Sequence, residues 1–187
     1  MVSNRRDDLL DAAIAVIGEQ GVRALTHRAV DSVAGLPAGS TSNYFRTKDA
    51  LLDGVVERMP VRERANWNAV AARAAPTGRA ELVAAVQDFV RDMAGRHRVL
   101  VLARHAILIE AAQQPRLREL LAATGQGVSD WFTNWMRTAG SRAPERDAPI
   151  VMNHVTGLVL HQLAIPDPSF GALGQVAALI EILLEEK

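Results

Sequence analysis

The amino-acid sequence predicts an all-α protein in which a small N-terminal helix-turn-helix unit precedes a larger helical bundle. Apolar residues recur every three to four positions along most of the chain, which is the spacing of amphipathic helices. No segment shows the sustained alternation of apolar and polar residues that is typical of a half-buried strand. Glycine and proline interrupt the helical pattern often enough to divide it into about nine helices.

Four helices are predicted in the first part of the chain. Gly21 ends the first helix, as a glycine in a left-handed conformation often does. Thr26 is a good N-cap for the second helix. Pro60 is expected to kink the fourth helix. The predicted ranges are 7–19, 26–35, 39–46, and from 47–48 to beyond Trp67.

Five further helices are predicted after a linker at residues 75–78. Proline and glycine separate these helices at Pro115, at 140–144 and at 166–168. The predicted ranges are 79–95, 98–113, 116–138, 146–164 and 171–185.

The composition, with 49% hydrophobic and 22% charged residues, is that of a globular protein. No segment approaches the roughly 20 apolar residues that a membrane helix needs, and no secretory h-region precedes the first helix. The chain has no cysteine, so disulfides, thiolate metal ligands and cysteine nucleophiles are excluded. We therefore expect a cytoplasmic protein with no membrane segment.

The charge is balanced, with 21 basic and 21 acidic residues overall. The first 50 residues are balanced as well: their bases are Arg5, Arg6, Arg23, Arg28, Arg46 and Lys48, and their acids are Asp7, Asp8, Asp11, Glu19, Asp31 and Asp49. Many DNA-binding domains are plainly basic, so net charge does not favour nucleic-acid binding here. Only the placement of these charges can favour it.

Residues 26–45 have the layout of a helix, a sharp turn and a second helix. Gly35 stands where the chain must reverse, and we expect a positive φ there, which glycine accepts without steric strain. Leu36 is expected to pack into the core, and Pro37 cannot extend the preceding helix.

The second helix of this unit, from Gly39 to Tyr44, has little to bury except Tyr44 and the following Phe45. Its hydroxyl and amide side chains suit base edges and phosphate oxygens in a major groove, where Asn43 can pair with adenine. Its N-terminal amides are expected to face phosphate, and Lys48 is placed to bind phosphate. Taken alone, the Gly-Ser-Thr-Ser-Asn run is more often a solvated loop.

Residues 7–56 hold a series of features in a fixed order: an amphipathic helix is followed by Gly21, Leu25-Thr26-x-Arg28, Ala34-Gly35, Gly39-Ser40, Tyr44-Phe45, Lys48 and Leu51-Leu52. This order resembles the TetR family of bacterial transcriptional regulators. Beyond this segment the resemblance rests only on size and helical pattern. It implies that 1–46 is a DNA-binding domain and 47–187 a helical regulatory and dimerisation domain.

The resemblance also implies roles for individual residues. Thr26, Arg28, Ser40 and Lys48 would contact phosphate, and Tyr44 matches a position that commonly reaches the DNA backbone. Thr41, Ser42 and Asn43 would face bases.

Two positions depart from the family pattern. Ser42 stands where an aromatic residue is usual, so the contact of that residue is lost or replaced. Asp31 stands where alanine is usual. Asp31 is expected either to pair with Arg28, three residues earlier on the same helix, or to point to solvent.

The last two predicted helices are apolar on more than one face, which requires cover on two sides. The resemblance implies that these helices pair with those of a second copy as a four-helix interface. Two recognition helices about 34 Å apart would then read successive major grooves of a palindromic operator. Burial within the monomer alone is the alternative.

A ligand site is predicted around Trp131 and Trp135, which lie four residues apart and so share a helix face. Ordinary core packing is the alternative for both tryptophans, and a structural role is the alternative for each histidine. The residues assigned to this site are His105, Ile109, Trp131, Trp135, Asn153 and His154.

Catalysis and metal binding find no support in the sequence, and no cofactor is expected. His154 and His161 are seven residues apart, about 10 Å along a helix, which is too far to share one zinc ion. No catalytic or nucleotide-binding motif is present. The sequence thus predicts a homodimeric repressor that binds double-stranded operator DNA and is released by a small-molecule inducer. The alternative is a helical small-molecule-binding or enzymatic bundle with a structural N-terminal unit.

Overall fold

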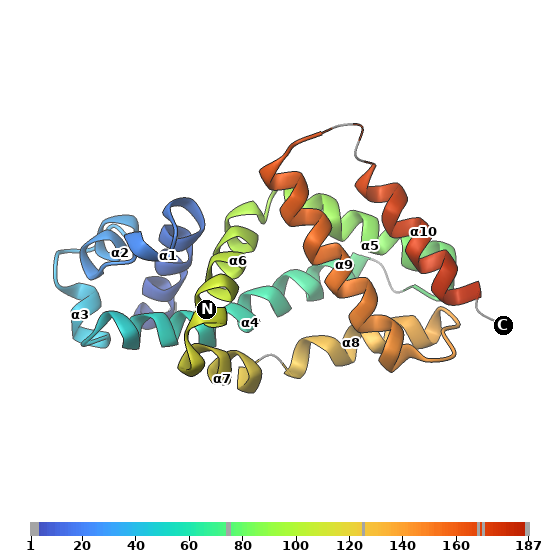
Figure 1. The fold of residues 1–187 in the computed structure, drawn as a ribbon. Helices are drawn as coiled ribbons and strands as arrows, with labels where there is room; N and C mark the ends of the chain where they lie inside the picture. Colours follow the sequence, from blue (N-terminus) through green and yellow to red (C-terminus); the bar gives the residue numbers. More distant parts are fainter. Residues whose placement is uncertain (1–3, 74–75, 125, 168, 170, 186–187) are drawn as a thin grey trace. The chain divides into compact units, whose positions relative to one another are not determined.

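The computed structural model describes residues 4–73, 76–124, 126–167, 169 and 171–185 (Figure 1). Over these ranges it contains ten α-helices, one short 3-10 helix and no strand, which confirms the predicted all-α fold. The helices are α1 Arg5–Gln20, η1 Val22–Ala24, α2 His27–Val33, α3 Ser40–Tyr44, α4 Lys48–Arg73, α5 Arg79–Ala94, α6 Arg98–Gln113, α7 Pro115–Thr124, α8 Gln126–Thr138, α9 Pro144–Ala164 and α10 Ala172–Glu185.

The helix count differs from the expected nine because one predicted helix, 116–138, is two helices, α7 and α8. Gly125, between them, lies outside the described residues, as do residue 75 of the predicted linker and Pro168 of the predicted break. Pro60 lies inside α4, which continues as one helix to Arg73. None of the described helices is both long and apolar enough to cross a bilayer.

The chain forms two compact units. Unit 1 comprises Met1–Glu63 and Val99–Gly125, and unit 2 comprises Arg64–Arg98 and Gln126–Lys187. The helix-turn-helix segment lies wholly in unit 1, together with α6 and α7. The expected boundary between DNA-binding and regulatory domains at residues 46 and 47 concerns function and stays a prediction.

The core of unit 1 is built on the apolar stripe of α1. Leu9, Ala13 and Val16 have no exposed surface, as the spacing of apolar residues predicted. Gly18 lets the backbone of α6 come close, because a Cβ there would lie 2.1 Å from the carbonyl oxygen of Val99. The other buried members from α4, α6 and α7 include Leu51, Leu52, Val55, Val56, Ala103, Ile107 and Leu117.

In unit 2, α9 contacts α5, α8 and α10, and α10 also contacts α5 (Figure 1). Val151, Val155, Leu158 and Val159 are buried on α9. A buried carboxylate, Asp147, accepts a hydrogen bond of 2.6 Å from the Ser141 hydroxyl and ties the start of α9 to the turn before it.

Candidate DNA-binding surface

The helix-turn-helix begins at Thr26, which caps α2 as predicted. Its side-chain oxygen accepts a hydrogen bond of 3.1 Å from the backbone N–H of Ala29. Since a hydroxyl that accepts a bond still carries its own hydrogen, Thr26 keeps a donor for a phosphate oxygen. The Thr26 side chain is exposed, so this donor is accessible.

The turn between α2 and α3 uses two glycines with positive φ. Gly35 has φ of 66° and Gly39 has φ of 94°, both in the region that other residues rarely adopt. Leu36 packs against the core of unit 1 from a half-buried position. The predicted positive φ of Gly35 and the predicted packing of Leu36 against the core are confirmed.

The first amides of α3 have acceptors within the protein. Gly39 N–H and Thr41 N–H donate to the carboxylate of Asp31, at 2.8 Å and 2.7 Å. Ser40 N–H donates to the carbonyl of Pro37 at 3.2 Å. The prediction that these amides face a phosphate is therefore wrong, because their hydrogen bonds are already made.

Asp31 is buried, with 3% of its surface exposed. Both expectations for it, a pair with Arg28 or exposure to solvent, are wrong. Burial opposes ionisation of Asp31, but hydrogen bonds from the Thr41 hydroxyl and the amides of Thr41 and Gly39, with the nearby charge of His27, outweigh it and lower its pKa. Asp31 thus serves as the acceptor for the start of α3.

Thr41 was expected to face bases, but its side chain is fully buried. Its hydroxyl donates to Asp31 Oδ1 at 2.5 Å, on the inner side of α3. Because its side chain has no exposed surface, Thr41 cannot belong to the surface that would meet DNA. The base-facing prediction for Thr41 is wrong.

The end of α3 is also held from α2. His27 Nε2 lies 2.7 Å from the carbonyl oxygen of Phe45, which can only accept, so Nε2 carries the hydrogen. The Phe45 ring is buried in the core of unit 1. Two side chains of α2, four residues apart, therefore hold opposite ends of α3.

The outer side of α3 presents Asn43 and Tyr44. Both are exposed, Tyr44 by 49%. Within the part of the chain that the structure describes, the Asn43 side chain makes no hydrogen bond. Ser40 and Ser42 are half-buried, and their hydroxyls donate to the carbonyls of Pro37 (2.7 Å) and Gly39 (2.8 Å). These serines keep lone pairs to accept from a donor on a base.

Ion pairs between α1 and α4 involve some of the acids that balance the charge of the N-terminal segment. The carboxylate of Asp11 accepts from Arg58 (3.0 Å) and Arg62 (2.6 Å), and Asp7 accepts from Arg58 (3.1 Å). The hydrogen bond with Asp11, together with the charges of the neighbouring aspartates, raises the pKa of Arg58 despite its burial. These pairs occupy acids of the N-terminal segment with cations from α4.

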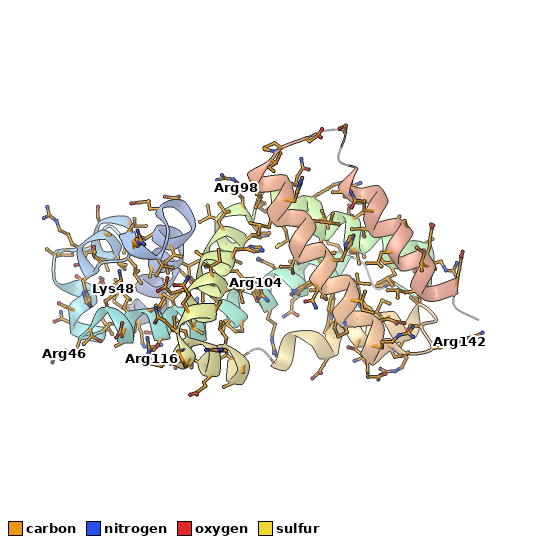
Figure 2. The ribbon with its side chains drawn as sticks, viewed as in Figure 1. Arg46, Lys48, Arg98, Arg104, Arg116 and Arg142 are labelled. Carbon is orange, nitrogen blue, oxygen red and sulfur yellow. The ribbon has the colours of Figure 1, made fainter. Side chains whose placement is uncertain are left out.

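Four cations in and next to the helix-turn-helix have no carboxylate partner among the described residues. Arg23, Arg28, Arg46 and Lys48 are exposed, and none forms an ion pair with any residue that the structure describes. Figure 2 shows Arg46 and Lys48 at the connection between α3 and α4. The Lys48 ammonium donates to the Arg23 carbonyl at 3.3 Å, which leaves two of its three hydrogens for phosphate.

The residues of the predicted ligand site are divided between the two units. His105 and Ile109 lie on α6 in unit 1, while Trp131 and Trp135 lie on α8, and Asn153 and His154 on α9, in unit 2. Ile109 is 63% exposed and Asn153 is exposed. A joint site of these residues stays a prediction.

An aromatic cluster in unit 2 is larger than the sequence indicated. The ring centroid of Trp131 lies 4.0 Å from that of Trp135 and 4.8 Å from that of Trp67. The Trp67 ring in turn stacks on the Phe89 ring, with 3.6 Å between their centroids. Trp67 and Phe89 were not assigned to the predicted site, because α4 and α5 are distant from α8 in sequence. Trp131 and Trp135 keep partly exposed rings, whereas Trp67 is buried.

Two buried polar atoms have no hydrogen-bond partner among the described residues: His105 Nε2 and Asn66 Nδ2. His105 Nδ1 lies 2.8 Å from the Val101 carbonyl and so carries the hydrogen, which makes Nε2 an acceptor when the ring is neutral. Asn66, next to Trp67, offers a donor. The described part of the chain holds no cluster of three or more metal-ligating side chains.

The fold and this surface define a class: a helix-turn-helix protein followed by a helical bundle. The family of bacterial regulatory proteins named after tetR matches residues 9–55, and the tetracyclin repressor-like C-terminal domain matches residues 77–186. The second match alone covers more than half of the chain. The chain belongs to the TetR family, and it is a transcriptional regulator rather than an enzyme.

Known proteins agree with this membership. The HTH-type transcriptional repressor KstR2 of Rhodococcus jostii (strain RHA1) is 37% identical over 54 residues, 29% of this chain and 26% of that protein. The match thus spans about a quarter of the relative's length. The solved structure of a protein described as a TetR-family regulator from Rhodococcus sp. has the same fold, with a TM-score of 0.75, 23% identity, and coverage of 96% of this chain and 98% of that chain.

A third neighbour is the multidrug binding protein EbrR in complex with ethidium. It is 25% identical, with a TM-score of 0.71, and the match covers 96% of this chain and 98% of that chain.

Proposed function

We propose that this regulator is a homodimeric repressor that binds a palindromic operator in double-stranded DNA and is released by a small-molecule inducer. The observation that carries the DNA-binding part is that Asn43 and Tyr44 are exposed on the outer side of α3, in a helix-turn-helix whose exposed cations form no ion pair with a described residue. Side chains that reach base edges specify sequence, while the cations bind phosphate. The matched repressor KstR2 supports the direction of regulation.

In this proposal Asn43 reads bases, with Ser42 beside it as an acceptor. Thr26, Arg28, Lys48 and Tyr44 contact the DNA backbone. Ser40 reaches the backbone only if its hydroxyl leaves the Pro37 carbonyl. Gly39 contributes its conformation, since its amide is already bonded to Asp31.

The dimer is supported by the apolar surface of the last two helices. On α10 only Val176 and Ile180 are buried, while Ile182 is 60% exposed. On α9, Ile150 is 40% exposed. A helix with apolar residues on its uncovered side needs a partner, and a second copy places two α3 helices for two half-sites. Such a repressor works in the cytoplasm, where the operator is accessible.

The inducer is proposed to be a flat aromatic compound that binds beside Trp131 and Trp135. The partly exposed rings of these tryptophans offer stacking surfaces. The neighbour EbrR was solved with ethidium and with proflavin, both flat aromatic dyes. Such a compound releases DNA only if it binds the DNA-free state more tightly.

Binding to a duplex selected from a random library, measured against a scrambled duplex, tests the DNA-binding proposal. We expect affinity that falls steeply with salt and a clear preference for the selected duplex. Asn43→Ala should reduce the preference, whereas Lys48→Ala should weaken both duplexes alike. Equal losses of affinity for both duplexes in both variants would contradict the assigned roles.

A further inference from the structure

The position of α3 depends on directional bonds more than on apolar packing. Of its five residues, Ser40 to Tyr44, only Thr41 is buried, and Thr41 is polar. Apolar anchoring lies outside these five residues: the Phe45 ring after the C-terminal end is in the core, and Leu36, four residues before Ser40, packs against it from a half-buried position. The N-terminal end of α3 therefore relies on polar contacts for its orientation.

Those contacts converge on one carboxylate. Asp31 Oδ2 accepts from Gly39 N–H at 2.8 Å, and Oδ1 accepts from Thr41 N–H at 2.7 Å and from the Thr41 hydroxyl at 2.5 Å. A charged group that is 97% buried is tolerated only with such a set of donors. Both oxygens are used, so a change at Asp31 alters two backbone positions at once.

We infer that Asp31 is a positioning residue for DNA recognition: by holding the amides of Gly39 and Thr41, it fixes α3 in the orientation in which Asn43 reads bases. Asp31 does not touch DNA in this scheme. The inference rests on the proposed DNA-binding function. It gives the operator-reading helix a support that lies on α2, outside the surface itself.

Electrostatics and positioning predict opposite effects for the variant Asp31→Asn. Removing an acid near the DNA increases the positive charge of the domain and should strengthen binding to every duplex. Asparagine keeps one acceptor oxygen but places an NH₂ group, which cannot accept, against a backbone N–H. If positioning dominates, the selected duplex loses affinity while the scrambled duplex does not.

The test measures the ratio of the dissociation constants for scrambled and selected duplexes, using the full-length protein. We expect Asp31→Asn to lower this ratio about tenfold, the scale of one lost base contact. Asp49→Asn is the charge-matched control, because Asp49 is exposed on α4 and forms no ion pair with a described residue; its ratio should not change. A ratio for Asp31→Asn equal to that of the wild type would overturn the inference.

Two further measurements separate positioning from unfolding. Hydrogen exchange of the Gly39 and Thr41 amides should be slow in the wild type and fast in Asp31→Asn, with helix content unchanged. If Asp31→Asn loses helix content, the variant Thr41→Val is the deciding test. It removes the hydroxyl donor, keeps both amide hydrogen bonds to Asp31 and should lower the ratio by a smaller factor. An unchanged ratio for Thr41→Val would then overturn the inference. A wild-type protein that prefers no sequence contradicts the proposed function itself, and the inference falls with it.

Discussion

The two helices on which the proposed function depends, α3 and α10, are stabilised in contrasting ways. α3 is short and polar, and three hydrogen bonds to Asp31 hold its first turn. α10 is long and apolar, yet only Val176 and Ile180 are buried on it. The contrast teaches that α3 is sensitive to single polar atoms, whereas in the proposed dimer the contribution of α10 depends on the apolar area that a second copy covers.

The largest expected effect comes from the exposed side of α10. Ile182→Glu should convert the dimer into a monomer and weaken operator binding by about 10² or more, because the avidity of two linked half-site contacts is lost. Sedimentation velocity and anisotropy titrations measure both effects. Val61→Glu, at a position 53% exposed on α4, is the control and should remain dimeric. A dimeric Ile182→Glu would place the interface elsewhere.

A second prediction concerns the close approach of α1 and α6 in the core of unit 1. Gly18→Ala should destabilise the protein by about 1–3 kcal/mol or more, because the new methyl group meets the Val99 carbonyl at 2.1 Å. Gly54→Ala should be milder, since its methyl group meets side-chain atoms of Phe45 and Leu10, at 2.8 Å and 2.9 Å, rather than backbone. Chemical denaturation ranks the two variants. Equal stabilities would mean that the crossing of α1 and α6 adjusts freely.

A third prediction uses the pH dependence of stability. Because Asp31 has a lowered pKa in the folded protein, its contribution is fully present above the ordinary aspartate pKa and is lost as the pH falls through the lowered value. At neutral pH, Asp31→Asn should reduce stability by about 1–3 kcal/mol. The difference from the wild type should shrink at acidic pH in thermal unfolding. A difference that is constant across this range would contradict the buried, ionised carboxylate.

The smallest expected effect concerns a single exposed cation. Arg46→Ala should leave stability unchanged and reduce the slope of log affinity against log salt by about 1, the value for one lost phosphate contact. Arg142→Ala, an exposed arginine of unit 2 (Figure 2), is the matched control and should leave the slope unchanged. Equal slopes for both variants and the wild type would remove Arg46 from the DNA-binding surface.

Sequence patterns predicted well what depends on local geometry. The cap at Thr26, the positive φ of Gly35 and the stripe of α1 all follow from residues close together in the chain. The roles of Asp31 and Thr41 were mispredicted because their bonds join residues eight to ten positions apart across a turn. A periodicity argument assigns faces to a helix but cannot tell which polar residue is buried with a partner.

The same limit applies to the aromatic cluster and to the charge balance. Trp131 and Trp135 were paired by their spacing, but Trp67 and Phe89 join them only through tertiary contacts. In the sequence, Asp7 and Asp11 counted only as negative charges that balance the basic residues. Their ion pairs with Arg58 depend on the packing of α1 against α4, which the sequence does not show.

The most direct test of the central claim is DNA cleavage from the edge of α3. The chain has no cysteine, so Ala38→Cys, an exposed position just before α3, allows a single tethered iron–EDTA group. We predict strand cleavage inside both halves of the selected duplex, with none from a group tethered at Arg142→Cys in unit 2. Cleavage from residue 142 alone, or from neither position on a bound duplex, would show that α3 does not face DNA.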